Sequence, residues 1–303
     1  MKYDIIIVGA GPAGLTAAIY ACRASKKALV LEAKSYGGQI INTPDIENYP
    51  VAPHISGFEF ATNLYNQAKD LGAEIKFEKV VEIRESGAGE KEVVTGKNTY
   101  TAGAVIIATG SESRKLGLAG EDELIGKGIS YCATCDGAFF RGKAVAVIGG
   151  GNTALEDALY LTDLASKVYL IHRRDEFRGE DKTVGILKER ANIEFVYNSR
   201  VTGLISGDRL TGIEVTDNDG GKREIAVDGL FVAIGRNPEN QNFAKLVNLD
   251  EAGYVIAGED CKTNIPGIFT AGDNRTKEVR QLVTAASDGA VAATAAVKYL
   301  NEK

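Results

Sequence analysis

Several residue types are scarce in this chain of 303 residues, and each scarcity excludes a class of protein. There is no tryptophan, and there are two histidines, four cysteines and six prolines. Four scattered cysteines are too few for the disulfide framework of a small secreted domain. His54 and His172, with no second cysteine pair besides Cys132 and Cys135, leave no ligand set typical of zinc, so we expect no bound metal.

Long apolar runs and an excess of positive charge are also missing. No run approaches the ~20 apolar residues of a membrane-spanning helix, and Met1–Asp4 lead directly into a strand pattern instead of a cleavable signal. The formal net charge is −6, whereas nucleic-acid binding requires clustered lysine and arginine. We therefore expect a cytoplasmic protein that binds neither membranes nor nucleic acid.

Glycine, in contrast, is abundant, and two glycine-containing segments resemble each other. The chain has 35 glycines and is 44% hydrophobic, which is enough for two domains with separate cores. Residues 4–14 (DIIIVGAGPAG) and 144–154 (AVAVIGGGNTA) each join an apolar strand to a glycine turn and a helix pattern. This context predicts an α/β fold with two Rossmann-like three-layer domains that bind dinucleotides.

A second pair of similar segments indicates how the domains are arranged along the chain. Residues 104–110 (AVIIATG) and 229–235 (GLFVAIG) each form an apolar run that ends in glycine. The second domain looks complete by about Gly235, so we expect the chain to return to the first domain, with two crossings that form a hinge. The predicted boundaries are 1–113 with 242–303 for the first domain, and 114–241 for the inserted second domain.

The first glycine motif predicts an FAD or NAD site. Gly9, Gly11 and Gly14 would allow a tight turn, close approach of a pyrophosphate, and packing of helix on sheet. Glu32 follows the strand pattern 28–31, where a carboxylate accepts hydrogen bonds from ribose hydroxyls and disfavours a 2′-phosphate. The turn residues Gly38, Gln39 and Asn48 are open to either a structural or a cofactor-binding role.

The second glycine motif predicts a different ligand. Its strand pattern, 167–171, ends in His172-Arg173-Arg174, with Arg178 four residues further on. Guanidinium groups bind phosphate through two hydrogen bonds, so arginine at this position indicates NADPH. The alternatives are a solvated basic loop and, for His172, a purely structural place at the strand end.

Cys132 and Cys135 are separated by two residues, a spacing that permits a reversible disulfide within one helical turn. If a helix begins near Cys132, its dipole would lower the pKa of that thiol. Asp136 could then act as general acid toward a departing thiolate. The alternatives are half of a metal site and a surface aspartate. Cys22 and Cys261 are expected to pack as small apolar residues.

Together these motifs, with Gly272-Asp273, closely resemble those of bacterial low-molecular-weight thioredoxin reductases over nearly the whole chain. The position of the cysteine pair just before the second glycine motif is the most specific element. The resemblance implies an enzyme that transfers hydride from NADPH to FAD, and then electrons through Cys135 to the disulfide. Cys132 would attack oxidised thioredoxin, with Asp136 completing the catalytic set.

The resemblance also implies the residues at each cofactor. Those near FAD would be Gly9, Gly11, Pro12, Ala13, Gly14, Glu32, Gly38, Gln39, Asn48, Gly110, Gly272, Asp273, Arg280, Gln281 and Ala285. Those near NADPH would be Gly149, Gly151, Asn152, Thr153, Ala154, His172, Arg173, Arg174, Arg178 and Gly235.

Further expectations from the resemblance concern assembly and partners. The family forms homodimers, and its NADPH domain rotates between the two half-reactions. Phe139 and Phe140 match an exposed contact for thioredoxin, although both could equally lie in the core. The segment Val51–His54 departs from the family, which commonly has glycine after Pro50.

Three other functions compete with this interpretation. One is an NADPH-dependent reductase of another thioredoxin-like or peroxiredoxin partner, which uses the same motifs. A second is a ferredoxin-linked flavoenzyme, which would lack either the cysteine pair or the arginines. The third is a non-catalytic dinucleotide sensor, which the cysteine pair argues against.

Overall fold

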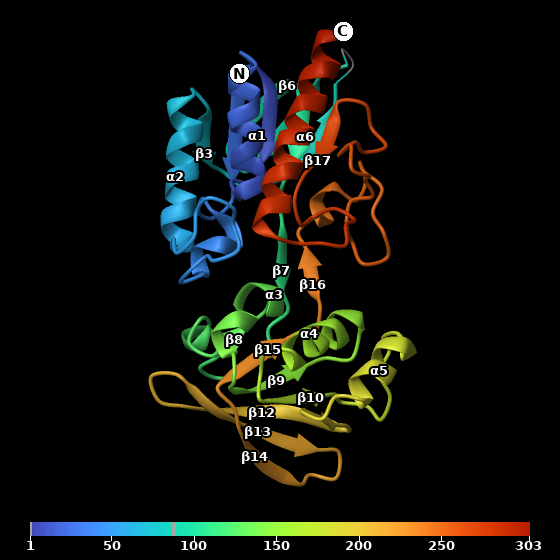
Figure 1. Ribbon diagram of the computed structural model, residues 1–303. Coiled ribbons are helices and arrows are strands. Elements are labelled where there is room, and N and C mark those ends of the chain that lie inside the picture. Colours follow the sequence, from blue (N-terminus) through green and yellow to red (C-terminus); the bar gives the residue numbers. More distant parts are fainter. Residues whose placement is uncertain (1, 87–88) are drawn as a thin grey trace. The chain divides into compact units, whose positions relative to one another are not determined.

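The computed structural model describes residues 2–86 and 89–303 (Figure 1). The chain divides into two compact units: unit 1, Met1–Glu112 with Asn237–Lys303, and unit 2, Ser113–Arg236. The sequence had placed these divisions after residues 113 and 241. The connecting segments, β7 (Ser111–Ser113) and β16 (Arg236–Pro238), pair with each other as a two-stranded sheet.

Unit 1 is built on a seven-stranded sheet in the order β3-β2-β1-β6-β5-β4, with β17 also pairing with β6. Strands β3, β2, β1, β6 and β17 are parallel, whereas β4, β5 and β6 pair antiparallel. The bounds are β1 Lys2–Val8, β2 Ala28–Glu32, β3 Glu74–Phe77, β4 Val80–Glu85, β5 Lys91–Thr95, β6 Thr99–Ile107 and β17 Ile268–Thr270.

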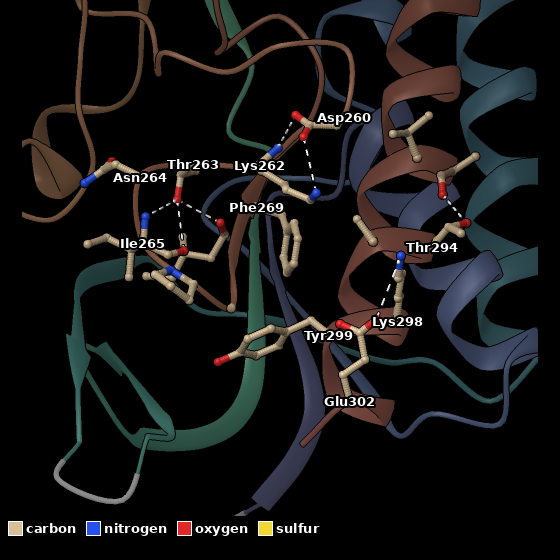
Figure 2. A pocket seen from close by; sticks show the side chains of 16 residues that line it. Asp260, Lys262, Thr263, Asn264, Ile265, Phe269, Thr294, Lys298, Tyr299 and Glu302 are labelled. Carbon is tan, nitrogen blue, oxygen red and sulfur yellow. Dashed lines mark hydrogen bonds and ion pairs between the residues drawn. The ribbon is translucent and has the colours of Figure 1, made fainter.

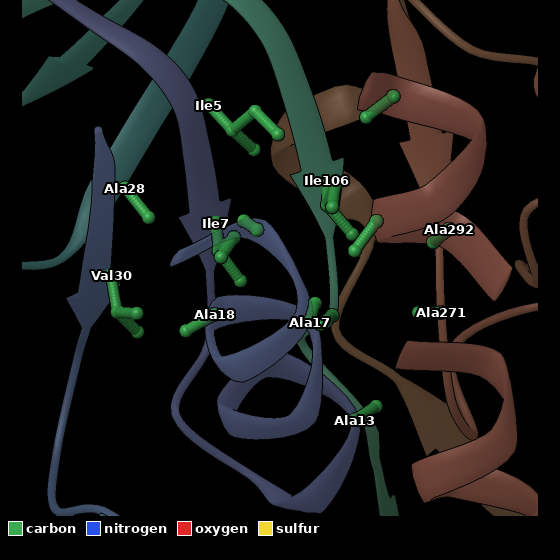
Figure 3. Close-up of a cluster of buried hydrophobic side chains, with 14 of the residues drawn as sticks. Ile5, Ile7, Ala13, Ala17, Ala18, Ala28, Val30, Ile106, Ala271 and Ala292 are labelled. Atoms are coloured by element: carbon green, nitrogen blue, oxygen red, sulfur yellow. The ribbon is translucent and has the colours of Figure 1, made fainter. Parts of the chain in front are cut away.

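Both faces of this sheet are buried, which explains why β1 and β2 are almost continuously apolar. Alternate residues such as Ile5 and Ile7 pack against helices α1 (Pro12–Arg23) and α6 (Leu282–Asn301), which lie together on one face (Figure 3). These helices approach closely because their contact is rich in alanine and glycine. A Cβ at Gly289 of α6 would lie 2.2 Å from the carbonyl oxygen of Ala13.

The remaining helices of unit 1 are short or peripheral. Helix α2 (Gly57–Asp70) is capped by Ser56, whose side chain accepts a hydrogen bond from the Glu59 amide. The 3₁₀ turns are η1 (Gly38–Asn42) and η4 (Gln241–Phe243). Among the described residues, no helix is long and apolar enough to cross a membrane.

Unit 2 has a five-stranded parallel sheet in the order β11-β10-β9-β15-β8. Apolar residues of helix α4 pack on one face, and an antiparallel sheet, β12-β13-β14, covers the other. The strand bounds are β8 Ile129–Ser130, β9 Ala144–Ile148, β10 Lys167–Ile171, β11 Ile193–Val196, β12 Ser199–Ser206, β13 Leu210–Asp217, β14 Lys222–Ala226 and β15 Gly229–Val232. The helices are α3 (Ala133–Asp136), α4 (Asn152–Thr162) and α5 (Asp181–Lys188), with 3₁₀ turns η2 (Asp122–Leu124) and η3 (Gly137–Phe140).

The two units repeat the same arrangement at the carboxyl ends of their central strands. The strand order reverses between β1 and β6 in unit 1, and between β9 and β15 in unit 2. The amides of Ala108 and Ala233 donate to the last residue of β1 and β9 respectively, each at 2.8 Å. Open α/β sheets bind ligands at such switch points. The predicted α/β fold with two Rossmann-like units, the second inserted in the first, is confirmed.

Candidate functional site

The glycine turn of unit 1 leaves space where a pyrophosphate is expected. Gly9 has φ of +109°, and a Cβ there would lie 2.3 Å from the carbonyl oxygen of Ala108. A Cβ at Gly14 would lie 1.9 Å from the carbonyl oxygen of Gly9. Gly11 is open, because the nearest atom to a Cβ there would be 4.0 Å away. Helix α1 begins at this turn with no side-chain cap and no acidic residue in its first turn, so its amides are available to an anion.

Glu32 is held in a fixed position at the end of β2. Its two carboxylate oxygens accept hydrogen bonds from the amides of Ala10 and Lys34, each at 2.7 Å. A carboxylate has about four acceptor positions, so capacity remains for ribose hydroxyls. These contacts fit a dinucleotide without a 2′-phosphate.

Other predicted FAD residues lie against the same turn or against each other. A Cβ at Gly38 would lie 3.3 Å from Cα of Gly11, and one at Gly272 would lie 2.9 Å from Cβ of Ala13. The side-chain Nδ2 of Asn48 donates to Gln281 Oε1 at 3.2 Å, which joins two loops far apart in sequence. Of the other predicted residues, Gln39 is exposed, Gly110 has φ of +71°, and Arg280 lies 4.3 Å over the Tyr254 ring. Ala285 packs on the core beside α1, and Asp273 is half-buried.

A buried ion cluster beneath Gly272 was not predicted from the sequence. The Asp288 carboxylate accepts from the Gly272 amide at 2.9 Å, from two nitrogens of Arg275 at 2.8 Å, and from Lys277 at 2.9 Å. Burial opposes ionisation of Asp288, but the hydrogen bonds from Arg275 and Lys277 outweigh it and lower its pKa. We call Arg275, Lys277 and Asp288 the Asp288 clamp. It fixes the segment that carries Gly272 and Asp273.

The glycine turn of unit 2 resembles that of unit 1 at its first two glycines, but it has Ala154 where unit 1 has Gly14. Gly149 has φ of +156°, and a Cβ there would lie 2.4 Å from the carbonyl oxygen of Ala233. Nothing lies within 4 Å of a Cβ at Gly151, and helix α4 begins there with no side-chain cap and no acid in its first turn. The Asn152 side chain accepts from the Glu180 amide at 2.9 Å. Of the other predicted residues, Thr153 is exposed, Ala154 is buried and Gly235 has φ of +109°.

The loop after β10 brings arginine to this turn. The amide of Arg178 donates to the Gly150 carbonyl at 2.6 Å, and Arg173 and Arg174 are exposed just beyond β10. Within residues 2–86 and 89–303, the side chains of these three arginines make no ion pair. Three uncommitted guanidinium groups near an open glycine turn fit a dinucleotide with a 2′-phosphate.

His172 has a different place from its arginine neighbours. It is 5% exposed, its ring stacks on Phe177 with centroids 5.3 Å apart, and a Cβ at Gly150 would lie 2.1 Å from Cε1. Burial lowers the pKa of His172, and the three arginines lower it further. A neutral ring supporting the turn favours the structural alternative at this position.

Cys132 and Cys135 form a disulfide, with Cα atoms 5.3 Å apart. Cys132 caps helix α3, and its Sγ accepts from the Cys135 amide at 3.2 Å. The expected helix therefore begins at Ala133, but it has only four residues, so few peptide dipoles align toward the sulfur. The alternative that the two cysteines form half of a metal site is not favoured, because their sulfurs are bonded to each other.

Asp136 follows Cys135 in the chain, is half-buried, and donates its amide to the Cys132 carbonyl at 3.1 Å. Burial raises its pKa, and a hydrogen bond from Ser130 Oγ at 2.6 Å acts in the opposite direction. A carboxyl group with a raised pKa retains a proton more readily, which suits a general acid. Ser130 was not predicted as part of this site, because a single serine before the cysteine motif carries no sequence signal.

The two phenylalanines after the disulfide and the two cysteines outside it pack against the protein interior. Phe140 is 5% exposed and meets Phe231 edge to face at 5.3 Å, so an exposed role is wrong for this residue. Phe139 is half-buried and packs against the same core. Burial raises the pKa of the Cys22 thiol, and it raises that of Cys261 to about 12, as expected for packed cysteines.

His54, in the segment that departs from the family pattern, lies beside two other potential metal ligands, Asp45 and Glu47. Ligand atoms of Asp45, Glu47 and His54 all lie within 4.8 Å of one another, a combination that counting histidines and cysteines had not anticipated. His54 Nδ1 lies 3.1 Å from an Asp45 oxygen, and this hydrogen bond raises the pKa of His54. Glu47 and His54 are exposed, and the ion pair is enough to explain the arrangement.

A large pocket lies elsewhere in unit 1 (Figure 2). It has a volume of about 680 Å³ and lies between the loop 260–269 and helix α6. Phe269 and Tyr299 line it, and the pairs Lys262–Asp260 and Lys298–Glu302 lie among its polar side chains. None of the residues predicted to bind cofactor lies in it, so its size does not make it the site of the chemistry.

Comparisons with known proteins agree with this geometry. The model of the pyridine nucleotide-disulphide oxidoreductase family matches residues 3–290. A thioredoxin reductase of Listeria monocytogenes is 44% identical over 99% of this chain and 94% of its own length; one of Treponema pallidum is 43% identical over 99% and 97%. The crystal structure of thioredoxin reductase from Streptococcus pyogenes superposes with a TM-score of 0.96 at 39% identity, covering 100% of this chain and 99% of that one.

The matches extend over nearly the whole chain, and they include both glycine turns and the disulfide between them. The family uses FAD and NADPH, the two ligands for which the open turns of units 1 and 2 are suited. The chain therefore belongs to the pyridine nucleotide-disulphide oxidoreductases and, among them, to the thioredoxin reductases.

Proposed function

We propose that this enzyme uses NADPH to reduce oxidised thioredoxin through the Cys132–Cys135 disulfide. The observation that carries the proposal is the disulfide next to Asp136, which follows Cys135 in the chain, donates its amide to the Cys132 carbonyl at 3.1 Å and has a carboxyl group whose pKa is raised by burial. The thioredoxin reductases of Listeria monocytogenes and Streptococcus pyogenes, named for this activity, match the chain over almost its full length.

Each unit would hold one cofactor. In unit 1 the amides at the start of α1 would bind the FAD pyrophosphate, and Glu32 would accept from its ribose. In unit 2 the start of α4 would bind the pyrophosphate of NADPH, and Arg173, Arg174 and Arg178 its 2′-phosphate. When bound, FAD would accept a hydride from NADPH and pass an electron pair to the disulfide.

The thiol chemistry then belongs to residues of unit 2. Two electrons break the Cys132–Cys135 bond, and Cys135 is assigned as the sulfur that receives them. Cys132, as thiolate, attacks the thioredoxin disulfide and forms a mixed disulfide, and the departing thioredoxin thiolate takes a proton from Asp136. Cys135 attacks Cys132, which restores the disulfide and releases reduced thioredoxin. One electron pair and two protons are consumed in each cycle.

The proposal includes three features of the working enzyme that concern its assembly and location. Unit 2 rotates between the half-reactions, which is supported by its connection through only two short strands, β7 and β16. The enzyme acts as a homodimer in the cytoplasm, which small-angle scattering and cell fractionation would test. A dissociated monomer at micromolar concentration would contradict the dimer.

An anaerobic titration of the FAD-loaded enzyme tests the function. NADPH should bleach the flavin absorbance, and oxidised thioredoxin should restore it. If NADPH causes no bleaching, the reductase assignment is wrong and a nucleotide sensor becomes the better explanation. If bleaching occurs but only a peroxiredoxin or another disulfide protein restores the absorbance, the chemistry stands and the partner is wrong.

A further inference from the structure

Ser130, at the end of β8, places a buried hydroxyl between the backbone of Cys132 and the carboxyl group of Asp136. The residue is 4% exposed. Its Oγ accepts from the Cys132 amide at 3.1 Å and lies 2.6 Å from Asp136 Oδ2 and 3.3 Å from the carbonyl oxygen of Cys132. A hydroxyl carries one proton, so it can donate fully to only one of these two oxygens.

Both protonation states of Asp136 can be satisfied by turning this hydroxyl. When Asp136 is a carboxylate, Ser130 donates to it and accepts from the Cys132 amide. When Asp136 is protonated, its O–H can donate to Ser130 Oγ, which accepts this second bond and donates its own proton to the Cys132 carbonyl. The Ser130 hydroxyl thus keeps a donor and an acceptor partner in either state, which a buried hydroxyl beside a proton-exchanging carboxyl group requires.

We propose that Ser130 is a positioning residue that couples proton transfer by Asp136 to the peptide unit of Cys132. The proposal rests on the function above, in which Asp136 gives its proton to the departing thioredoxin thiolate. As that proton leaves, the Ser130 hydroxyl turns from the Cys132 carbonyl to the new carboxylate and stabilises its charge. The Ser130 proton itself stays on Ser130, and the turn reverses when Asp136 is protonated again.

Among the residues that the structure describes, no charged group contributes to the pKa shift of Asp136. Helix α4, which packs against α3, presents Tyr160 and Leu161 toward Gly137. Among the described residues, burial and the Ser130 hydrogen bond are the causes that shift the pKa of Asp136, and Ser130 alone acts to lower it. Burial therefore raises the pKa of Asp136, and the hydrogen bond from the Ser130 hydroxyl limits that rise.

The variant Ser130→Ala tests this in the FAD-loaded enzyme with thioredoxin as substrate. Because an acid must be protonated to act, wild-type activity falls as pH rises through the pKa of Asp136. Loss of a hydrogen bond to the carboxylate should move this fall to higher pH by about one unit. Ser130→Thr keeps a hydroxyl and should restore the wild-type profile. Comparison with a small aromatic disulfide as substrate removes any contribution from ionisation of thioredoxin.

Ser199→Ala is the matched control, since it removes another buried hydroxyl of unit 2 that donates only to the Tyr197 carbonyl at 2.7 Å. It should leave the pH profile unchanged. A Ser130→Ala enzyme that is slower at every pH, with an unshifted profile, would overturn the inference while leaving the reductase function intact. If Ser130→Ala does not fold, Ser130→Gly gives the same comparison. Failure of wild type to reduce thioredoxin would instead overturn the proposed function.

Discussion

The two glycine turns share their backbone geometry but differ in the charge that follows. Gly9 and Gly149 both have positive φ, and a Cβ at either would approach the carbonyl oxygen of the residue that follows the neighbouring strand, to 2.3 and 2.4 Å respectively. In unit 1 the next strand ends in Glu32, which accepts hydrogen bonds from backbone amides. In unit 2 the corresponding strand, β10, is followed by arginines with uncommitted side chains. The glycine turn thus provides for a pyrophosphate in both units, while the strand end selects which dinucleotide binds.

The units also differ in what has been added to the shared arrangement. Unit 1 has the Asp288 clamp, which fixes Gly272 beside α1 through buried charges. Unit 2 has the disulfide and the carboxyl group of Asp136. The addition in unit 1 stabilises a binding site, and the addition in unit 2 supplies reactive groups, so substitutions in the two should fail in different ways.

The largest effect is expected for Cys132→Ser, which removes the sulfur that attacks thioredoxin. Thioredoxin reduction should fall to background, because serine does not form the mixed disulfide. Reduction of the flavin by NADPH should persist, because neither glycine turn is altered. Stopped-flow absorbance of the flavin and a thioredoxin-coupled assay measure the two steps separately. Retained thioredoxin reduction would refute the role of Cys132.

The next largest effect is expected for Asp288→Asn in unit 1. Arg275 and Lys277 would remain buried without their counter-charge, which should cost about 3–5 kcal/mol of unfolding free energy and release FAD. Denaturant titration and flavin retention measure both. Glu259→Gln is the control, because that carboxylate is 94% exposed and lies 3.4 Å from the same arginine. Equal losses in the two variants would contradict the importance of burial.

Acid titration of the same variants sharpens this prediction. The pKa of Asp288 is lowered in the folded state, so its contribution to stability is complete above the ordinary value of 3.8 and is lost as pH falls through the lowered value. Asp288→Asn should remove this part of the acid sensitivity of the wild type. An unchanged difference between variant and wild type across this range would contradict it.

The sequence predicted those parts of the molecule that depend on local pattern. Strand, glycine turn and helix follow one another within about a dozen residues, so the turns at Gly9 and Gly149, the residues at both strand ends and the disulfide were all identifiable. The Asp288 clamp joins residues of a loop and of the alanine-rich helix α6, and nothing in either segment shows that the charges are buried. The sequence likewise could not show whether the side chains of Phe139 and Phe140 are buried or exposed, because burial depends on the sheet against which they pack.

A smaller effect is expected for Gly14→Ala, which tests whether the two turns tolerate the same side chain. The new Cβ would meet the Gly9 carbonyl oxygen at 1.9 Å, and such overpacking should cost ~1–3 kcal/mol and weaken FAD binding. Unit 2 has Ala154 at the equivalent position, where it is buried. Ala154→Gly should therefore cost less, about 1 kcal/mol from helix propensity. Comparable losses of the two variants in calorimetry would contradict the clash expected at Gly14.

The smallest effect is expected for the double variant Arg173→Ala with Arg174→Ala, which removes charge from the strand end of unit 2 without touching its turn. Both side chains are exposed, so folding and flavin content should be unchanged. The KM for NADPH should rise about tenfold, because each guanidinium can bind the 2′-phosphate, whereas the KM for NADH should stay constant. Arg209→Ala, at another exposed arginine of unit 2, should change neither constant. Equal increases for NADPH and NADH would mean that these arginines support the loop and do not distinguish the ligands.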